Sequence, residues 1–197
     1  MSTFISMVIT ALYAMLLQNV IFTGGFGSTE AIRISSRPRF VLLSALFITF
    51  FSSVTSVICR SVELFSVVGE YGFIRKLLLY IGVLFAVYII VSLILIYVFK
   101  ANPVIIRRLG VSAFNTLVIS VPILNQRAAY TVSESIASGI GAGLAFFLAV
   151  MIIHAGIRML DNNPSIPKPF KGTPAIFLYV SLIALAFAGW TGSAILV

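Results

Sequence analysis

Long uncharged segments alternate with short charged ones along the chain. Between consecutive Asp, Glu, Lys and Arg residues, the long uncharged segments are 1–29, 40–59, 77–99, 109–126, 135–157 and 172–197. A helix needs roughly 20 apolar residues to cross the bilayer hydrocarbon, so each segment suffices for one crossing and none for two. The segments lack the alternation over about ten residues that barrel strands show. The pattern predicts an all-α polytopic membrane protein with six transmembrane helices.

Composition agrees with this pattern and excludes some functions. Hydrophobic residues make up 60% of the 197 residues and charged residues only 9%, whereas about a quarter of a typical soluble domain is charged. Six crossings use most of the chain, so we expect residues 1–197 to form a single membrane domain without a soluble catalytic part. The net charge of +8 does not call for nucleic acid, because loops facing anionic lipid often carry such an excess.

Basic residues are distributed unequally between the two sides of the predicted bundle. The loops after the first, third and fifth spans hold nine of them: Arg33, Arg37, Arg39, Lys100, Arg107, Arg108, Arg158, Lys168 and Lys171. The opposite side holds four, which are Arg60, Arg75, Lys76 and Arg127, together with Glu63, Glu70 and Glu134. Because basic loops stay in the cytoplasm, we expect both termini outside.

Three spans per half place residues 1–100 and 101–197 in opposite orientations, as in two inverted three-helix repeats. The first span of each half carries an Asn and then helix-breaking residues: Asn19, Gly24, Gly25 and Gly27 in one half, and Asn115, Thr116, Ser120 and Pro122 in the other. Gly frees the backbone and Pro removes a donor. Lipid cannot satisfy the exposed backbone groups, so broken first and fourth spans are expected to line an ion or cofactor path. The alternative is that the first span ends near Phe22 and that Pro122 is a tolerated kink.

The six uncharged segments contain little catalytic or metal-binding chemistry. They have no carboxylate for a proton relay or for cation binding. His154 is the only imidazole and Cys59 the only thiol; a lone His near a span end is typical of an interfacial residue, and a lone Cys of a small buried one. We therefore expect no catalytic residues and no metal site.

Small residues recur at every fourth position in the fifth predicted span, at Ser135, Gly139 and Gly143. Such a ridge lets two helix backbones approach closely. It predicts helix packing, either within the chain or against a neighbouring protein of an assembly.

Several motifs resemble a known family. They are Pro169-Phe170-Lys171-Gly172, the segment 181–192, the segment 102–110, Leu124-Asn125, Ile157-Arg158 and Asn19. In them the sequence resembles the six-span membrane subunits of Rnf and Nqr complexes, which are ion-translocating electron-transport assemblies of bacterial membranes, and most of all the Rnf A subunit. The resemblance implies the bacterial plasma (inner) membrane, a homologous six-span partner of opposite topology and other redox subunits. It also implies a cysteine in each broken span, which together with the partner's cysteines would hold an iron–sulfur cluster.

The sequence departs from this pattern at the implied cluster ligands. It has no Cys between Asn19 and Arg39, and the Asn-Cys of the family corresponds to Asn115-Thr116 or, without a gap, to Ser120. Hydroxyl oxygens are poor substitutes for thiolates at such a cluster. We therefore expect no cofactor bound by this chain alone, and a cluster shared with a partner is the alternative.

Two functions are compatible with these observations. The favoured one is a non-catalytic integral membrane subunit of an Rnf/Nqr-like, ion-translocating electron-transport complex that lacks its own cluster ligands. The alternative is a cluster-free membrane transporter or membrane anchor that reuses the same inverted-repeat fold.

Overall fold

The computed structural model describes residues 3–36, 38–65 and 72–192, so Arg37 and Glu70 of the charge count lie outside the described residues. Within these ranges every regular element is helical. The helices long and apolar enough to cross a membrane are Pro38–Leu64, Phe73–Val98, Pro103–Arg127, Val132–Asp161 and Thr173–Thr191, and Thr3–Leu17 is apolar but shorter. The predicted all-α, multi-pass membrane protein is confirmed at this level.

The first half of the chain begins with a helix that is interrupted twice. Helix α1 (Thr3–Leu12) continues into the π-helical turn η1 (Tyr13–Leu17), and two short helices follow, α2 (Val20–Gly24) and α3 (Ser28–Ser35). A 3-10 turn, η2 (Pro38–Phe40), leads into α4 (Val41–Phe65). Helix α5 (Phe73–Leu93) and the turn η4 (Ile94–Val98) complete this half.

The second half of the chain also begins with an interrupted helix, which has one break. Its elements are α6 (Pro103–Ala113), α7 (Thr116–Arg127), α8 (Val132–Asp161), η5 (Lys168–Phe170) and α9 (Thr173–Thr191). Local sequence explains where these helices begin. The Asn102 side chain accepts a hydrogen bond from the Val104 amide at the start of α6, and Thr131 and Glu134 form a capping box at the start of α8.

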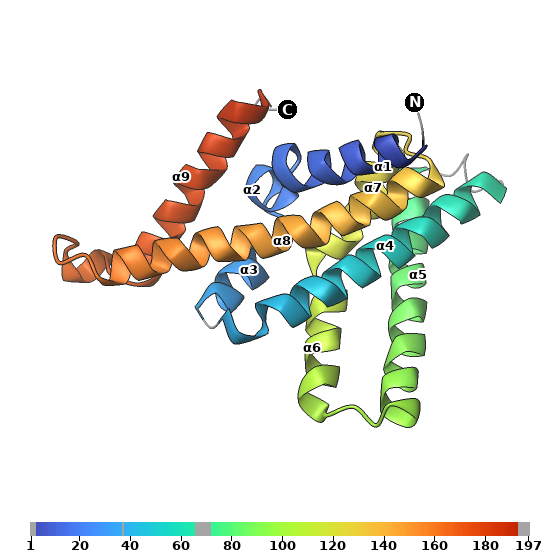
Figure 1. Ribbon diagram of the computed structural model, residues 1–197, viewed down its shortest axis with the longest axis horizontal. Coiled ribbons are helices and arrows are strands. Elements are labelled where there is room, and N and C mark those ends of the chain that lie inside the picture. Colours follow the sequence, from blue (N-terminus) through green and yellow to red (C-terminus); the bar gives the residue numbers. More distant parts are fainter. Residues whose placement is uncertain (1–2, 37, 66–71, 193–197) are drawn as a thin grey trace.

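Helices α4 and α8 run antiparallel through the centre of the molecule, side by side (Figure 1). Small residues of α8 permit this close approach. A Cβ at Gly139 would lie 2.5 Å from Ser53 Cα, and one at Gly143 would lie 2.8 Å from Thr49 Cβ. The third residue of the predicted ridge, Ser135, is fully buried.

On another face α8 packs against α1. A Cβ at Gly141 would lie 2.6 Å from the carbonyl oxygen of Ala11 and 2.8 Å from Ala14 Cβ. Helix α8 is therefore enclosed by α1 and α4, and it contributes large buried side chains such as Phe146 and Ile153 to the core.

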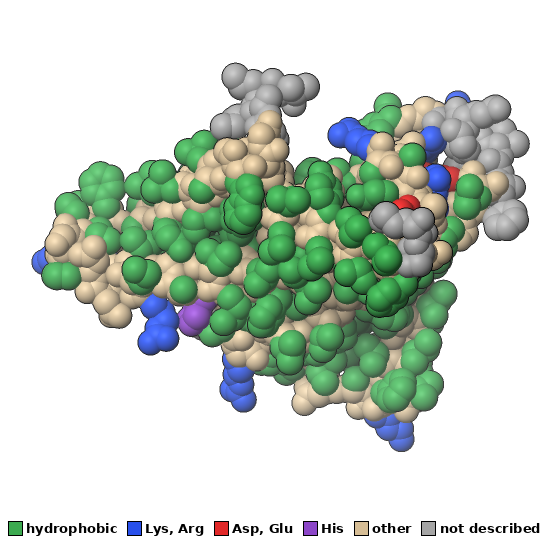
Figure 2. All heavy atoms as spheres, turned by 45° about the horizontal axis from the view of Figure 1, so that its top comes forward, with side chains coloured by type: hydrophobic (Ala, Val, Ile, Leu, Met, Phe, Trp, Pro, Cys, Tyr) green, Lys and Arg blue, Asp and Glu red, His purple; other side chains and the backbone are tan. Residues whose placement is uncertain are grey.

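The helix ends gather on two sides of the molecule. In Figure 1 the end of α3, the turn between η4 and α6 and the connection from α8 to α9 lie along the lower and left edges. The start of α1, the end of α9 and the turn between α7 and α8 lie along the upper edge and toward the right. Figure 2 shows Lys and Arg side chains projecting from the lower and left edges, and others at the upper right beside the visible Asp and Glu side chains.

Candidate functional site at the two helix breaks

The first break is built around Asn19. This residue has a non-helical backbone (φ −64°, ψ 88°), and its Oδ1 accepts a hydrogen bond of 3.3 Å from the Ile21 amide, which starts α2. Its Nδ2 donates to the carbonyl oxygens of Met15 at 3.4 Å and of Ala145 in α8 at 3.5 Å. Asn19 is only 1% exposed. The residue therefore caps a new helix and ties the break to α8.

A second interruption follows where α2 meets α3. Gly24 is the last residue of α2, and Gly25 and Gly27 have positive φ angles of 71° and 78°. Glycine adopts this left-handed conformation without the steric cost that a Cβ imposes. The glycines therefore let the chain turn twice within a few residues.

The break in the second half lies at Phe114–Asn115, between α6 and α7. Asn115 has an extended backbone (φ −70°, ψ 135°), and its Oδ1 accepts a hydrogen bond of 3.0 Å from the Leu117 amide. The side chain thus caps α7 as Asn19 caps α2. Asn115 is 5% exposed, and its Nδ2 has no hydrogen-bond partner among the described residues.

The two interrupted regions contact each other directly. The Gly27 amide donates a hydrogen bond of 2.8 Å to Oγ1 of Thr116. A Cβ at Gly27 would lie 2.8 Å from Asn115 Oδ1 and 3.1 Å from Leu117 Cβ. The structure therefore brings Gly27, Asn115 and Thr116 together, whereas Asn19 makes its tertiary hydrogen bond to α8.

Pro122 does not interrupt its helix. It lies inside α7, which continues to Arg127, and the break that the sequence suggested at this proline falls at Asn115 instead. Asn115 can start a new helix because its side chain replaces a missing helical acceptor. Pro122 only removes one backbone donor, and the buried helix tolerates this. Ser120 also lies within α7, where its hydroxyl donates to the Leu117 carbonyl at 2.7 Å.

His154 and Cys59 lie outside the two breaks. His154 Nδ1 lies 2.7 Å from the Ser35 carbonyl oxygen and joins α8 to the end of α3. Cys59 is a free, buried thiol of α4. The described parts of the chain contain no group of three or more His, Cys, Asp and Glu side chains that could hold a metal ion.

A buried polar cluster near the end of α4 was not predicted. Glu63 pairs with Arg60 at 3.2 Å and accepts a hydrogen bond from the Tyr80 hydroxyl, which also lies 3.5 Å from Gln126 Oε1. The Glu63 side chain is only 7% exposed, although charge counting placed it on a loop. The spacing of Arg60 and Glu63, three residues apart on one helix face, was the available signal.

Buried polar atoms without a hydrogen-bond partner concentrate on α4 and on the α6–α7 pair. Among the described residues they include side-chain atoms of Ser44, Ser52, Thr55, Ser56, Ser112, Asn115 and Asn125. Most buried polar groups in proteins have a partner. Hydroxyl groups and side-chain amides can bind water, so these two regions are polar positions within an otherwise apolar bundle.

Comparison with known proteins decides the family. The chain is 28% identical over 182 residues to the A subunit of the ion-translocating oxidoreductase complex of Actinobacillus pleuropneumoniae, covering 90% of this chain and 92% of the relative. It is 31% identical over 147 residues to the A subunit of the proton-translocating ferredoxin:NAD(+) oxidoreductase complex of Clostridium ljungdahlii, covering 71% and 76%. The chain belongs to the family of Rnf-type A subunits of ion-translocating oxidoreductase complexes.

A further relative in this family is the A subunit of the Na(+)-translocating ferredoxin:NAD(+) oxidoreductase complex of Acetobacterium woodii. It is 34% identical over 107 residues, which are 52% of this chain and 55% of the relative. No family model matches the chain. The resemblance to the Rnf A subunit that the motifs indicated is confirmed. The names of the relatives differ in the ion, which is the proton in one and Na⁺ in the other.

Proposed function

We propose that this chain is the integral membrane A subunit of an Rnf-type complex that couples electron transport to ion translocation. The observation that carries this proposal is its similarity to A subunits of such complexes over most of its length. The role is a non-catalytic one, and the other redox subunits of the complex carry out the electron chemistry. This family membership favours the complex over a free-standing transporter or a simple membrane anchor.

The proposed architecture has six spans in two inverted three-helix repeats, residues 1–100 and 101–197. The first span comprises α1, η1, α2 and α3, and the fourth comprises α6 and α7. Two observations support this pairing. Asn19 and Asn115 cap the helix after the break in the same manner, and α4 and α8, the second helices of the two halves, pack against each other.

The proposed ion path runs along the broken spans, past the polar and backbone groups of Asn19, Gly24, Gly25, Gly27, Asn115, Thr116, Ser120 and Pro122. Its support is the buried Asn115 amide, whose Nδ2 has no partner among the described residues. An unpaired amide in an apolar interior costs free energy unless it binds another group. A water molecule in the path would supply that group by accepting a hydrogen bond from Nδ2.

The donor set at the breaks does not fit an iron–sulfur cluster. Such clusters are held by thiolates, whereas the contact between the breaks consists of an Asn amide, a Thr hydroxyl and a backbone N–H. A Cβ at Gly27 would already press on Asn115, so a side-chain ligand at this position would displace the asparagine. In this proposal the chain therefore supplies no cluster ligand.

The proposed location is the bacterial plasma membrane, with both termini outside. The basic residues around the end of α3, the start of α6 and the connection from α8 to α9 support this orientation. The proposed partners are a homologous six-span protein of opposite topology and the redox subunits. Large exposed apolar side chains on α5 and α9, such as Phe85 and Leu182, provide surface for lipid and for such a partner.

Ion uptake driven by electron transport in membrane vesicles tests this proposal. Asn19→Leu and Asn115→Leu remove the polar groups of the two breaks, and Asn162→Leu makes the same change at the exposed end of α8. We expect both break variants to lose most ion uptake and the control to keep it. Immunoblots and co-purification must show that each variant accumulates and assembles. Normal uptake in assembled Asn19→Leu and Asn115→Leu complexes would contradict the ion path and favour the role of a membrane anchor.

A further inference from the structure

A cavity of about 430 Å³ opens between α3 and α6, away from the contact between the two breaks. Three arginines and a serine line it, Arg33 and Ser36 from the end of α3 and Arg107 and Arg108 from the first turns of α6. Val104 and Val111 add apolar wall on the α6 side. Its volume lies within the range of about 300–1,000 Å³ that is typical of small-molecule sites.

Two of the three guanidinium groups are held in place by neighbours. Arg33 forms a two-pronged pair with Glu30, with Nε–Oε2 at 2.7 Å and a second hydrogen bond to Oε1 at 2.8 Å. The guanidinium carbon of Arg108 lies 4.5 Å from the centre of the Phe40 ring, which is a cation–π distance. Binding a ligand therefore requires little reordering of these side chains.

The cavity carries more positive than negative charge. Glu30 neutralises Arg33, whereas neither Arg107 nor Arg108 has an acidic partner among the described residues. Two guanidinium groups without an acidic partner thus border one cavity. The guanidinium fork matches the oxygens of a phosphate group, and this geometry makes Arg the preferred residue for phosphate recognition.

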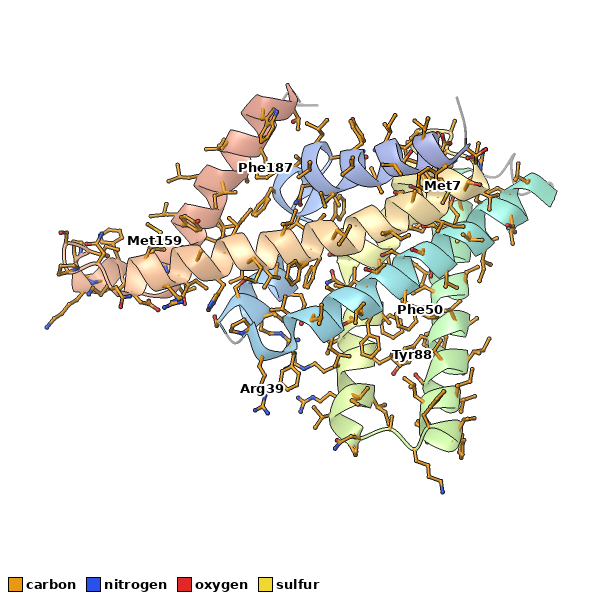
Figure 3. All side chains as sticks on the ribbon, viewed as in Figure 1. Met7, Arg39, Phe50, Tyr88, Met159 and Phe187 are labelled. Carbon is orange, nitrogen blue, oxygen red and sulfur yellow. The ribbon has the colours of Figure 1, made fainter. Side chains whose placement is uncertain are left out.

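The surroundings favour a lipid as the source of that phosphate. Arg107 lies one turn into α6, part of the membrane-crossing segment Pro103–Arg127, and exposed Val104 lies one turn before it. The same edge of the molecule presents Arg39, which projects below the turn between α3 and α4 (Figure 3). Pockets lined by Lys and Arg between membrane helices, near the face that carries the basic loops, are suited to anionic lipid headgroups. A soluble phosphate would use the guanidinium groups but leave the apolar wall without a contact.

We infer that this cavity binds the phosphate headgroup of an anionic phospholipid. The two arginines without an acidic partner bind the phosphate oxygens, and Val111, one turn further along α6, contacts the glycerol and the upper acyl chain. This inference concerns a site apart from the helix breaks and does not depend on the proposed ion path.

Lipid binding to the full chain in detergent tests the inference, with native mass spectrometry as the readout. The probes are phosphatidylglycerol, phosphatidylcholine with the same acyl chains, and inorganic phosphate. We expect wild-type protein to bind phosphatidylglycerol at least about tenfold more tightly than phosphatidylcholine, and inorganic phosphate not to compete at millimolar concentration. Equal binding of the two lipids, or full competition by inorganic phosphate, would overturn the assignment to a lipid.

Matched variants separate the cavity from the general basic surface. Arg107→Ala combined with Arg108→Ala should abolish the preference for phosphatidylglycerol, whereas Arg158→Ala, the same change at an exposed position of α8, should keep it. Replacing Arg107 and Arg108 by Lys should retain part of the preference, because the charge remains without the fork. Arg107→Ala alone breaks no ion pair among the described residues, so it provides a folded variant if the double change unfolds the protein. A preference that persists in Arg107→Ala and in the double variant would contradict the inference.

Discussion

At both helix breaks an asparagine side chain starts the next helix by accepting a hydrogen bond from the backbone N–H two residues later. The two asparagines differ in the hydrogen bonds that their side-chain nitrogens donate. Nδ2 of Asn19 donates to Met15 and to Ala145 of α8, whereas Nδ2 of Asn115 has no partner among the described residues. The first asparagine is tied into the bundle at both ends of its side chain. The second is tied at one end, which leaves a buried donor for another molecule.

The contact between the breaks offers the largest expected effect on stability. Gly27→Ala adds a Cβ both at a positive φ and against Asn115 Oδ1 and Leu117 Cβ. Strain and overpacking each cost about 1–3 kcal/mol, so we expect the free energy of unfolding to fall by about 3 kcal/mol in SDS titrations of the solubilised protein. Gly25→Ala has the same backbone conformation but open space around its Cβ, and it should cost only the strain. Equal losses in the two variants would show that the breaks do not press on each other.

Serine at each asparagine tests the difference between the two amides. Serine also caps helices, so the substitution mainly removes the amide nitrogen. Asn19→Ser should lower the free energy of unfolding by about 1–2 kcal/mol, because it loses the hydrogen bonds to α8 and to Met15. Asn115→Ser should not lower it, because no bond of that nitrogen is lost and a buried donor without a partner is removed.

In ion uptake we expect the reverse ranking of the two serine variants, with the larger loss in Asn115→Ser. If the free donor of Asn115 serves the ion path, Asn115→Ser lowers ion uptake in vesicles at normal protein level. A stable and fully active Asn115→Ser variant would remove the distinction between the two breaks.

The hydrogen bond between Gly27 and Thr116 predicts a smaller effect. Thr116→Val keeps the shape of the side chain but leaves the Gly27 amide without its acceptor. We expect Thr116→Val to lower the free energy of unfolding by about 1 kcal/mol. Thr116→Ser should retain most of the wild-type stability, because it keeps the hydroxyl acceptor. Amide hydrogen exchange at Gly27 should also become faster in Thr116→Val than in Thr116→Ser. Unchanged exchange would mean that another group accepts this hydrogen bond.

The smallest expected change in the free energy of unfolding is that of a substitution at Pro122. Pro122→Ala restores a donor for the Val118 carbonyl within α7 and removes part of a buried ring. These effects oppose each other, and we expect the unfolding free energy to rise by less than about 1 kcal/mol. A large loss of stability would mean that the proline is required for the shape of α7.

The helical membrane architecture could be predicted because it depends on composition along short segments. Uncharged runs long enough to cross a bilayer indicate helices without any knowledge of their neighbours. The breaks were also visible, because Asn and Gly carry local preferences for helix starts and for positive φ. Pro122 was assigned too strong a role because the same local reasoning ignores a buried helix that tolerates a missing donor.

Features that join distant segments could not be predicted. The sequence predicted that the two breaks line one path, but the particular hydrogen bond between Gly27 and Thr116, which are 89 positions apart, could not be predicted. Burial of Glu63 was missed because the charge of Arg60 was taken to end the second span, whereas α4 continues to Phe65. The pairing of the two charges and the hydroxyl of Tyr80 make that extension possible.

The close contact between α4 and α8 limits how the two halves of the chain can move. These helices belong to different halves, and Gly139 and Gly143 leave no room for a Cβ against Ser53 and Thr49. Many inverted-repeat transporters work by rocking one half against the other, and such rocking here would separate this seam and forfeit its van der Waals contacts. For the proposed ion path, this contact favours a stationary frame, in which an ion would move past fixed helices.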